Sequence, residues 1–300
     1  MIDVIGIGGS LLDTIYLLPE YPAEDTKVKA GQTLLQCGGP VGTALAVLGR
    51  LGLPCAYLGA MGDDPAGRAM VDDFTKFRVE TSGIRQRAGS QSAAACVIVG
   101  QNRASRTIIW SPGNAKPLQP EELDLQLMEQ AQVLHLDGLQ PEAALYAARW
   151  FKSRGKIVSL DGGSFHPGVE KLVELADWLV CAEEFALKLT GETDTEKAVR
   201  VLYDRYHPMM IAATQGKQGG IYFDGRNLAH YRPFTVDVAD TTGAGDVFHG
   251  AFVYARLQGW DWPQVFRFAS AVAALKCTRP GGRTGIPTLP EVSAFLKERP

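Results

Sequence analysis

The sequence predicts an α/β fold in which helices cover both faces of a mostly parallel sheet, with a small second sheet attached. Three observations support this prediction. Short apolar runs, most of which end in glycine or an acidic residue, alternate with segments of helical period. Two stretches, residues 14–36 and 92–110, interrupt the alternation because they have no helical period. The 300 residues, 46% hydrophobic and 21% charged, can bury one large core, so we expect a single domain over residues 1–300.

Six apolar runs are expected to form the main sheet. Apolarity along the whole run is typical of a strand that is buried on both faces. The runs span residues 3–9, 55–62, 132–138, 156–163, 177–184 and 209–216, and the helical segments between them span residues 41–52, 65–77, 141–155, 182–191 and 195–206. Because ligands of such sheets lie at the carboxyl ends of the strands, we expect the functional site there.

The two interrupting stretches are expected to form the small sheet. Residues 92–110 resemble a hairpin, with GQNRAS at 100–105 as its turn. We therefore expect lid strands inserted into the domain at about 14–36 and 92–110. A flap of this kind can close over a ligand.

Composition excludes several classes of partner. The net charge is −3 and no cluster of five or more basic residues occurs, so no nucleic-acid partner is expected. No apolar run approaches the length of a membrane span, and the first residues are interpreted as a strand, not a signal peptide. The five cysteines show neither CxxC nor zinc spacing, and their odd number fits a reducing compartment. A cytoplasmic protein is therefore expected.

The stretch DTTGAGDVFHG at 240–250 is the strongest local signal. Gly243 and Gly245 permit backbone conformations with positive φ, and apolar residues at 248, 251, 252 and 255 predict a buried helix after them. Free N–H groups at the start of that helix would bind an anion. Asp246 is then expected to take a proton from a hydroxyl that attacks phosphorus, while the N–H groups stabilise the transferring phosphoryl group. The simpler alternative is that Asp246 only caps the helix.

Two common phosphate-binding motifs are absent from the sequence. A P-loop requires Ser or Thr after its lysine, but Gln218 follows Lys217. The dinucleotide fingerprint requires glycine at position 11, where Leu11 stands. The commonest ATP-binding and NAD-binding folds are therefore not indicated.

DTTGAGDVFHGAF at 240–252 resembles the C-terminal signature of the ribokinase-like (PfkB-type) carbohydrate kinases. Further segments resemble family segments in the same order over nearly the whole chain; they span residues 38–52, 58–67, 111–115, 214–220 and 273–287. The wording of the last segments is most similar to the sulfofructose-kinase branch. The resemblance implies the family's three-layer α/β/α core with a β-sheet lid, and ATP-dependent phosphorylation of a sugar or sugar-like hydroxyl.

The resemblance also implies roles for single residues. Asp246 would be the catalytic base, and the anion hole would consist of Gly243, Ala244 and Gly245. Sugar hydroxyls would be held by Asp13, Gly38, Gly39, Thr43 and Asp137. The ATP site would include Thr214, Gly216, Gly219, Gly245 and Ser270. Asp13 and Asp137 follow predicted strands, where a carboxylate can accept two hydroxyls; the alternative for both is a capping role.

Cofactors and assembly follow from the same resemblance. Mg²⁺ would bridge the ATP phosphates, and a monovalent-cation site, for which K⁺ is the candidate, would be formed by Asp240 and Thr242 together with the backbone of Lys276, Arg279, Gly281 and Gly285. The lid would also form a homodimer contact.

The sequence departs from the family pattern at two places. Thr43 stands where family members usually carry an asparagine that contacts sugar, so the identity of the substrate stays open. The NxxE segment, associated with magnesium and phosphate, would fall at 182–185, where both the asparagine and the glutamate are missing. Glu183 or Glu184 acting through water is a candidate replacement.

Two basic residues of the lid have two interpretations each. Lys27 and Arg106 either are solvated charges or meet an acidic group of the substrate, such as a phosphate, carboxylate or sulfonate. His249, one helical turn after Asp246, is interpreted as a packing residue.

Three functions are weighed on this basis. The first is a sugar kinase. The second is a nucleoside kinase of the same family, for which Leu12, Tyr16 and Trp110 could supply an apolar base pocket. The third is a non-catalytic binding protein that kept the fold, which the missing NxxE residues favour and the intact GAGD segment disfavours.

Overall fold

A computed structural model describes residues 2–100, 102, 105–166 and 168–299, with Ser105 and Arg106 described by their backbone alone. Within these residues the main sheet has ten strands, in the order β14-β13-β12-β11-β10-β9-β1-β4-β5, with β6 paired to β4. The strands are β1 (Val4–Ile7), β4 (Cys55–Gly62), β5 (Val79–Glu80), β6 (Ile84–Arg87), β9 (Val133–Leu136), β10 (Ile157–Gly162), β11 (Trp178–Ala182), β12 (Met210–Thr214), β13 (Gly220–Phe223) and β14 (Leu228–Tyr231). Pairing is parallel from β12 to β5 and antiparallel at β13 and β14.

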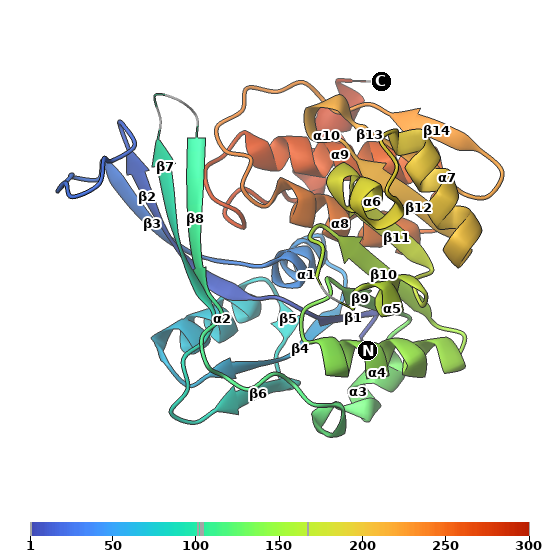
Figure 1. Cartoon of the computed structure of the whole chain (residues 1–300), viewed down its shortest axis with the longest axis horizontal. Helices are drawn as coiled ribbons and strands as arrows, with labels where there is room; N and C mark the ends of the chain where they lie inside the picture. The colour runs from blue at the N-terminus through green and yellow to red at the C-terminus, as the bar shows by residue number, and fades with distance from the viewer. Residues whose placement is uncertain (1, 101, 103–104, 167, 300) are drawn as a thin grey trace.

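Helices cover both faces of this sheet (Figure 1). One face packs against α1 (Pro40–Arg50), α2 (Pro65–Lys76), α8 (Ala244–Leu257), α9 (Trp262–Cys277) and α10 (Leu289–Lys297). The other packs against α3 (Leu125–Gln130), α4 (Pro141–Ser153), α5 (Glu170–Val173), α6 (Glu183–Thr190) and α7 (Thr195–Tyr206). Short 3₁₀ turns lie at η2 (Pro120–Glu122) and η3 (Gly216–Gln218). The predicted three-layer α/β/α core is confirmed.

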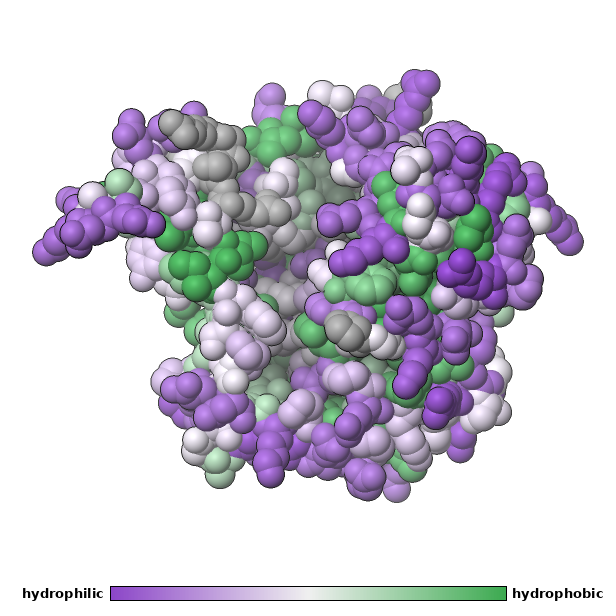
Figure 2. All heavy atoms as spheres, in the orientation of Figure 1, coloured by the Kyte–Doolittle hydropathy of each residue, from purple (hydrophilic) through white to green (hydrophobic). Residues whose placement is uncertain are grey.

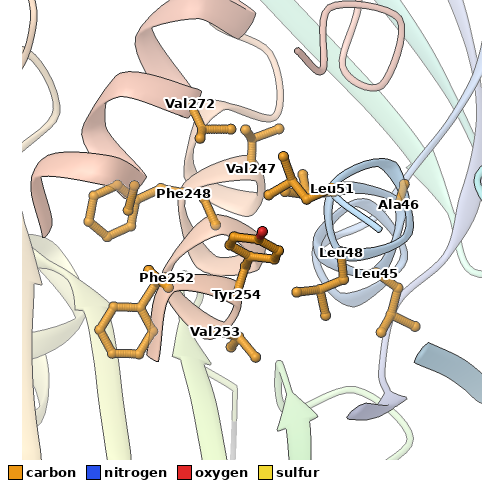
Figure 3. Packing of buried hydrophobic residues seen from close by; sticks show 14 of the residues in the cluster. Leu45, Ala46, Leu48, Leu51, Val247, Phe248, Phe252, Val253, Tyr254 and Val272 are labelled. Carbon is orange, nitrogen blue, oxygen red and sulfur yellow. The ribbon is translucent and has the colours of Figure 1, made fainter. Parts of the chain in front are cut away.

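Alternation along the strands divides the core into two parts. In β1, Val4 belongs to the α1 and α8 side, whereas Ile5 and Ile7 belong to the α4 side. On the first side, Leu48 of α1 and Leu51 directly after that helix face Val247 and Val253 of α8 (Figure 3). Since α8 is held by this buried packing, its first turn is a rigid platform for the site.

The small sheet stands apart from the large one and forms the lid (Figure 1). Its strands are β2 (Leu11–Leu18), β3 (Gln32–Gly38), β7 (Ala94–Gly100) and β8 (Ser105–Ser111), in the order β3-β2-β7-β8. The face drawn in Figure 2 is hollowed between the lid and the large domain. The prediction of a β-sheet lid is confirmed, and β7 and β8 form the predicted hairpin.

All six predicted strands and all five predicted intervening helices are present, with ends that differ by a few residues. Four strands were not predicted: β5, β6, and β13 and β14, which extend the sheet with antiparallel pairs. The helices α3, α5, α9 and α10 were not predicted either. No helix in the described residues is long and apolar enough to cross a membrane.

Candidate active site

The first turn of α8 lies at the head of the site. Gly243 precedes the helix with a φ of 72°, a left-handed conformation that favours glycine. The N–H groups of Gly245 and Asp246 find no acceptor among the described residues, so they are free to bind an anion. The cap position belongs to Gly243, and Asp246 is the third residue of the helix with no capping bond from its side chain. The alternative in which Asp246 only caps the helix is therefore wrong.

Asp246 has the electrostatics of a base. Burial raises the pKa of Asp246 to about 7, and the Asp161 and Asp137 carboxylates act in the same direction, against His249 and Arg283. No donor in the described part of the chain hydrogen-bonds its carboxylate. The group can therefore accept a proton from a bound hydroxyl near neutral pH.

A buried ion pair lies next to this base. His249 Nε2 is 3.1 Å from Asp161 Oδ1, and both side chains are almost completely buried. Burial acts to raise the pKa of Asp161, but the contact with His249 acts to lower it, and the pKa of Asp161 lies below its ordinary value. His135 lies behind the pair, with its ring centre 6.0 Å from that of His249 and its Nδ1 3.2 Å from Ser159 Oγ. The interpretation of His249 as a packing residue missed this pair, although the acid at the end of the 156–163 run was the available signal.

Asp13 brings a second free carboxylate to the site. It lies on β2 and is 9% exposed, and no donor is recorded for it within the described residues. Burial raises the pKa of Asp13 to about 6, against the charge of Arg283. A Cβ at Gly38 would lie 2.3 Å from Asp13 Oδ2, so a side chain at this position would displace the Asp13 carboxylate. Asp13, Gly38 and Gly39 are thus brought together at the base of the lid, as the sequence analysis expected.

Asp137 differs from these two carboxylates because backbone groups already bind it. Its Oδ2 accepts from the N–H of Gly9 at 2.7 Å and of Val41 at 3.2 Å, and its Oδ1 accepts from that of Leu139 at 2.9 Å. These bonds fix the loop after β1 and the start of α1. The contact of Asp137 with a sugar hydroxyl stays a prediction.

A cavity of about 410 Å³ opens beside the first turn of α8. It brings together the residues predicted for the nucleotide; they are Thr214, Gly216, Gly219, Gly245 and Ser270. The apolar side chains of Tyr231, Phe234 and Phe248 line it as well. A planar base suits such walls, and the free N–H groups of α8 lie at the same cavity, where phosphates would be needed.

Comparison with known proteins agrees with this geometry. Residues 1–289 match the family model described as pfkB family carbohydrate kinase. The chain belongs to the PfkB family. It is therefore a carbohydrate kinase, a phosphotransferase with an alcohol group as acceptor, and the alternative of a non-catalytic binding protein is wrong.

Relatives cover nearly the whole chain. Ribokinase from Bacillus subtilis is 26% identical over 99% of this chain and 100% of its own length. A probable fructokinase-3 from Arabidopsis thaliana is 27% identical, over 99% of this chain and 92% of its own length. The crystal structure of a putative ribokinase from Agrobacterium tumefaciens has a TM-score of 0.89 and 30% identity, covering 99% of this chain and 97% of that one. Nothing in these similarities singles out the sulfofructose-kinase branch.

One PfkB structure carries the expected cofactors. A putative ribokinase II from E. coli, described in complex with ATP and Mg²⁺, superposes with a TM-score of 0.87. At 22% identity this likeness shows the fold alone.

The first departure from the PfkB pattern has a structural explanation. Thr43 is buried, and Nε of Arg283 donates to its Oγ1 at 3.3 Å. The same guanidinium donates to the Gly38 carbonyl at 2.7 Å and pairs with Asp73 at 2.6 Å. Arg283 is only 2% exposed. A hydroxyl at position 43 therefore faces a guanidinium, which the sequence analysis missed; the role of Thr43 in sugar binding stays a prediction.

The second departure gives Glu183 a direct partner. Glu183 Oε1 accepts from Nε2 of Gln215 at 2.6 Å and from the hydroxyl of Thr195. Gln215 stands between Thr214 and Gly216, so Glu183 holds the loop that lines the nucleotide cavity. Glu184 lies elsewhere, in a separate polar pocket with Lys188.

The lid residues divide between the two faces of its sheet. Strand register places Trp110 on the same face as Asp13 through Ala95, whereas Leu12 and Tyr16 alternate with Asp13 and point to the opposite face. Leu12, Tyr16 and Trp110 therefore do not line one common pocket for a nucleoside base. Lys27 is exposed in the loop between β2 and β3. Arg106 lies on β8, and its side chain is outside the described residues.

The residues predicted for a monovalent cation gather around Asp240. Gly281 N–H donates to its Oδ2, Thr242 N–H donates to its Oδ1, and Lys276 Nζ donates to its carbonyl. A Cβ at Gly285 would lie 2.7 Å from the Lys276 carbonyl, so the loop that contains Gly285 packs against the end of α9. The side chain of Arg279 pairs with Glu291 at 2.6 Å, which leaves the predicted backbone role of Arg279 a prediction.

Proposed function

We propose that this carbohydrate kinase transfers the γ-phosphoryl group of ATP to a hydroxyl of a sugar held between Asp13 and Asp246. One observation carries the proposal. The Asp246 carboxylate has no donor among the described residues, and it lies in the same helical turn as free N–H groups that border the 410 Å³ cavity. A base and an anion site within one turn suit proton removal and phosphoryl transfer at neighbouring atoms.

The residues divide the work as follows. Asp13 accepts hydrogen bonds from sugar hydroxyls and orients the acceptor, which converts the encounter into a reaction between fixed partners. Asp246 takes the hydroxyl proton as the oxygen attacks phosphorus. The N–H groups of Gly245 and Asp246 then donate to the oxygens of the transferring group as their charge develops.

The described residues fit a magnesium ion that arrives with the nucleotide. They contain no group of three or more His, Cys, Asp or Glu side chains arranged to hold a metal. Mg²⁺ commonly binds substrate phosphates and water with one or two carboxylates, so such a cage is not required. When bound, the ion would neutralise phosphate charge, and Asp246 and Asp161 are the nearby carboxylates.

The decisive experiment measures ADP release with a panel of acceptors and then removes the base. Ribose, fructose, an acidic ketose and adenosine are each mixed with MgATP. We expect turnover with a sugar, and a loss of about 10²–10⁴-fold in kcat for Asp246→Asn. ATP binding, measured by calorimetry, should be retained in that variant. An unchanged rate would remove Asp246 from the mechanism, and turnover of adenosine alone would favour a nucleoside kinase.

The charge of Lys27 offers a test of substrate class. The side chain is exposed on the lid loop, where it can meet a negative group of the acceptor. If it does, Lys27→Ala loses more activity toward an acidic ketose than toward a neutral one. Equal losses would end this idea.

The outer lid face supports a homodimer of two copies of this chain. Leu35 and Ile109 are 65% and 59% exposed, and register places them in one row across the four strands with Thr14 and Cys96. An apolar row on a solvent-facing sheet is typical of an interface. Leu35→Asp should convert a dimer to a monomer in sedimentation, whereas Met209→Asp, at an exposed site elsewhere, should not.

A further inference from the structure

The cation site implied by the family resemblance contains a buried lysine side chain. Lys276 is 0% exposed, although lysine is almost never fully buried without a partner. Its ammonium group donates to the carbonyl oxygen of Asp240 at 2.9 Å. The positive charge is therefore already present beside an oxygen that the resemblance assigns to the cation.

The other oxygens of Asp240 are also occupied. Thr242 N–H donates to Oδ1 at 2.8 Å, and Gly281 N–H donates to Oδ2 at 2.8 Å. The carbonyl oxygen and both carboxylate oxygens of Asp240 therefore already accept hydrogen bonds from the chain itself.

A free K⁺ does not fit this arrangement. It would have to share the oxygens of Asp240, which three donors of the chain now use. It would also lie beside a buried ammonium, where like charges repel strongly because water is excluded.

We propose that the Lys276 ammonium is a tethered cation that takes the place of K⁺, so that this enzyme needs no monovalent cation. The charge holds Asp240 and the following residues, which lead directly into Gly243 and the first turn of α8. The functional consequence rests on the proposed kinase mechanism, because that turn is the anion site. The structural claim, a filled cation site, is independent of it.

The first test compares salts with no sugar present. Thermal unfolding of the ligand-free protein is measured in KCl, NH₄Cl and tetramethylammonium chloride at equal ionic strength. Wild-type protein should show the same Tm in all three. Lys276→Ala opens the site, so K⁺ or NH₄⁺ should raise its Tm by a few degrees over the bulky cation.

A matched variant separates a filled site from general salt effects. Lys152 pairs with the buried carboxylate of Asp177 on the other side of the sheet. Lys152→Ala also removes an ammonium from a buried acid, and we expect it to show no preference for K⁺. Lys276→Met fills the opened space, so it should be destabilised without rescue by any cation.

The second test uses ADP release with the best acceptor. Wild-type rates should be equal in the three salts, and Lys276→Ala should lose at least tenfold in kcat in tetramethylammonium and recover partly in KCl or NH₄Cl. A K⁺-specific gain in Tm or rate for wild type would overturn the inference, as would folded Lys276→Ala that gains nothing. If no acceptor is phosphorylated, the kinase proposal fails while the thermal result still decides this one. Should Lys276→Ala not fold in any salt, the wild-type comparison decides alone.

Discussion

The pH dependence of the reaction follows from the groups that face Asp246. They are Asp161 at the end of β10, Asp137 after β9, His249 on α8 itself and Arg283 from the C-terminal loop. His249 is the one that contacts another carboxylate of this group, because its Nε2 lies 3.1 Å from Asp161 Oδ1. We therefore expect His249→Gln, which retains a donor toward Asp161 but no charge, to make Asp246 harder to ionise.

The size of the effect can be worked out from the pKa of about 7 for Asp246. Half of the enzyme then carries the ionised base at pH 7. A nearby like charge that loses its counterion raises a carboxyl pKa by about 1 unit or more. The ionised fraction at pH 7 would fall to about 10%, so kcat/KM would fall about fivefold there and stay unchanged near pH 9.

The assay is the pH profile of kcat/KM for the sugar at saturating MgATP. Ser159→Ala is the control. Ser159 is buried two residues before Asp161, and its hydroxyl contacts His135, which is not bonded to Asp246, so this variant should leave the pH profile unchanged. Adding Asp161→Asn to His249→Gln removes the uncompensated charge, so the acid limb should return toward its wild-type position. An acid limb that His249→Gln leaves in place, or that the double variant does not move back, would refute the reasoning.

The remaining predictions concern three other residues of the site. Asp13→Asn should raise KM for the sugar by about tenfold or more and leave KM for ATP unchanged, because a charge-assisted hydrogen bond to a hydroxyl is lost; equal changes in both constants would contradict this. Arg283→Met should lower the free energy of unfolding by about 3 kcal/mol in urea titrations, since it leaves Asp73 and the Gly38 carbonyl without their donor. Arg283→Lys should recover only part of this, because an ammonium cannot reach all three acceptors. For Asp246, a folded-state pKa raised from 3.8 to about 7 means that stability falls as pH rises between these values. Asp246→Asn should make that fall smaller in ligand-free thermal unfolding, with the share that comes from Asp13 remaining, and an unchanged slope would show that the Asp246 carboxyl is not perturbed.

Local patterns in the sequence were sufficient for most of the fold. The runs that became β4 and β12 and the helix α4 are apolar or periodic over several turns, so their state depends little on distant residues. The turn before α8 was predictable for the same reason, since Gly243 and Asp246 act within four positions of one another. By contrast β13 and β14 are only four residues each, and their pairing is set by the edge of an existing sheet.

The parts of the site that sequence analysis missed depend on distant contacts. Arg283 meets Thr43 across 240 positions, and Glu183 meets Gln215 across 32. The pair of Asp161 and His249 likewise joins a strand to a helix far along the chain. Residue type alone gives no sign of such partners, because the sequence does not distinguish a buried arginine from an exposed one.

The bonds of Gly282 and Arg283 have a consequence for biosynthesis. Gly282 N–H donates to Gln36 Oε1 at 2.8 Å, and the Arg283 guanidinium donates to Gly38 and Thr43. Residues 282 and 283 therefore hold in place the end of β3, the lid strand that leads into α1. A nascent chain on the ribosome cannot assemble a working enzyme until these residues have left the exit tunnel. A stop codon in place of the codon for Gly281 would thus release a product that contains all strands of both sheets but has an unanchored lid.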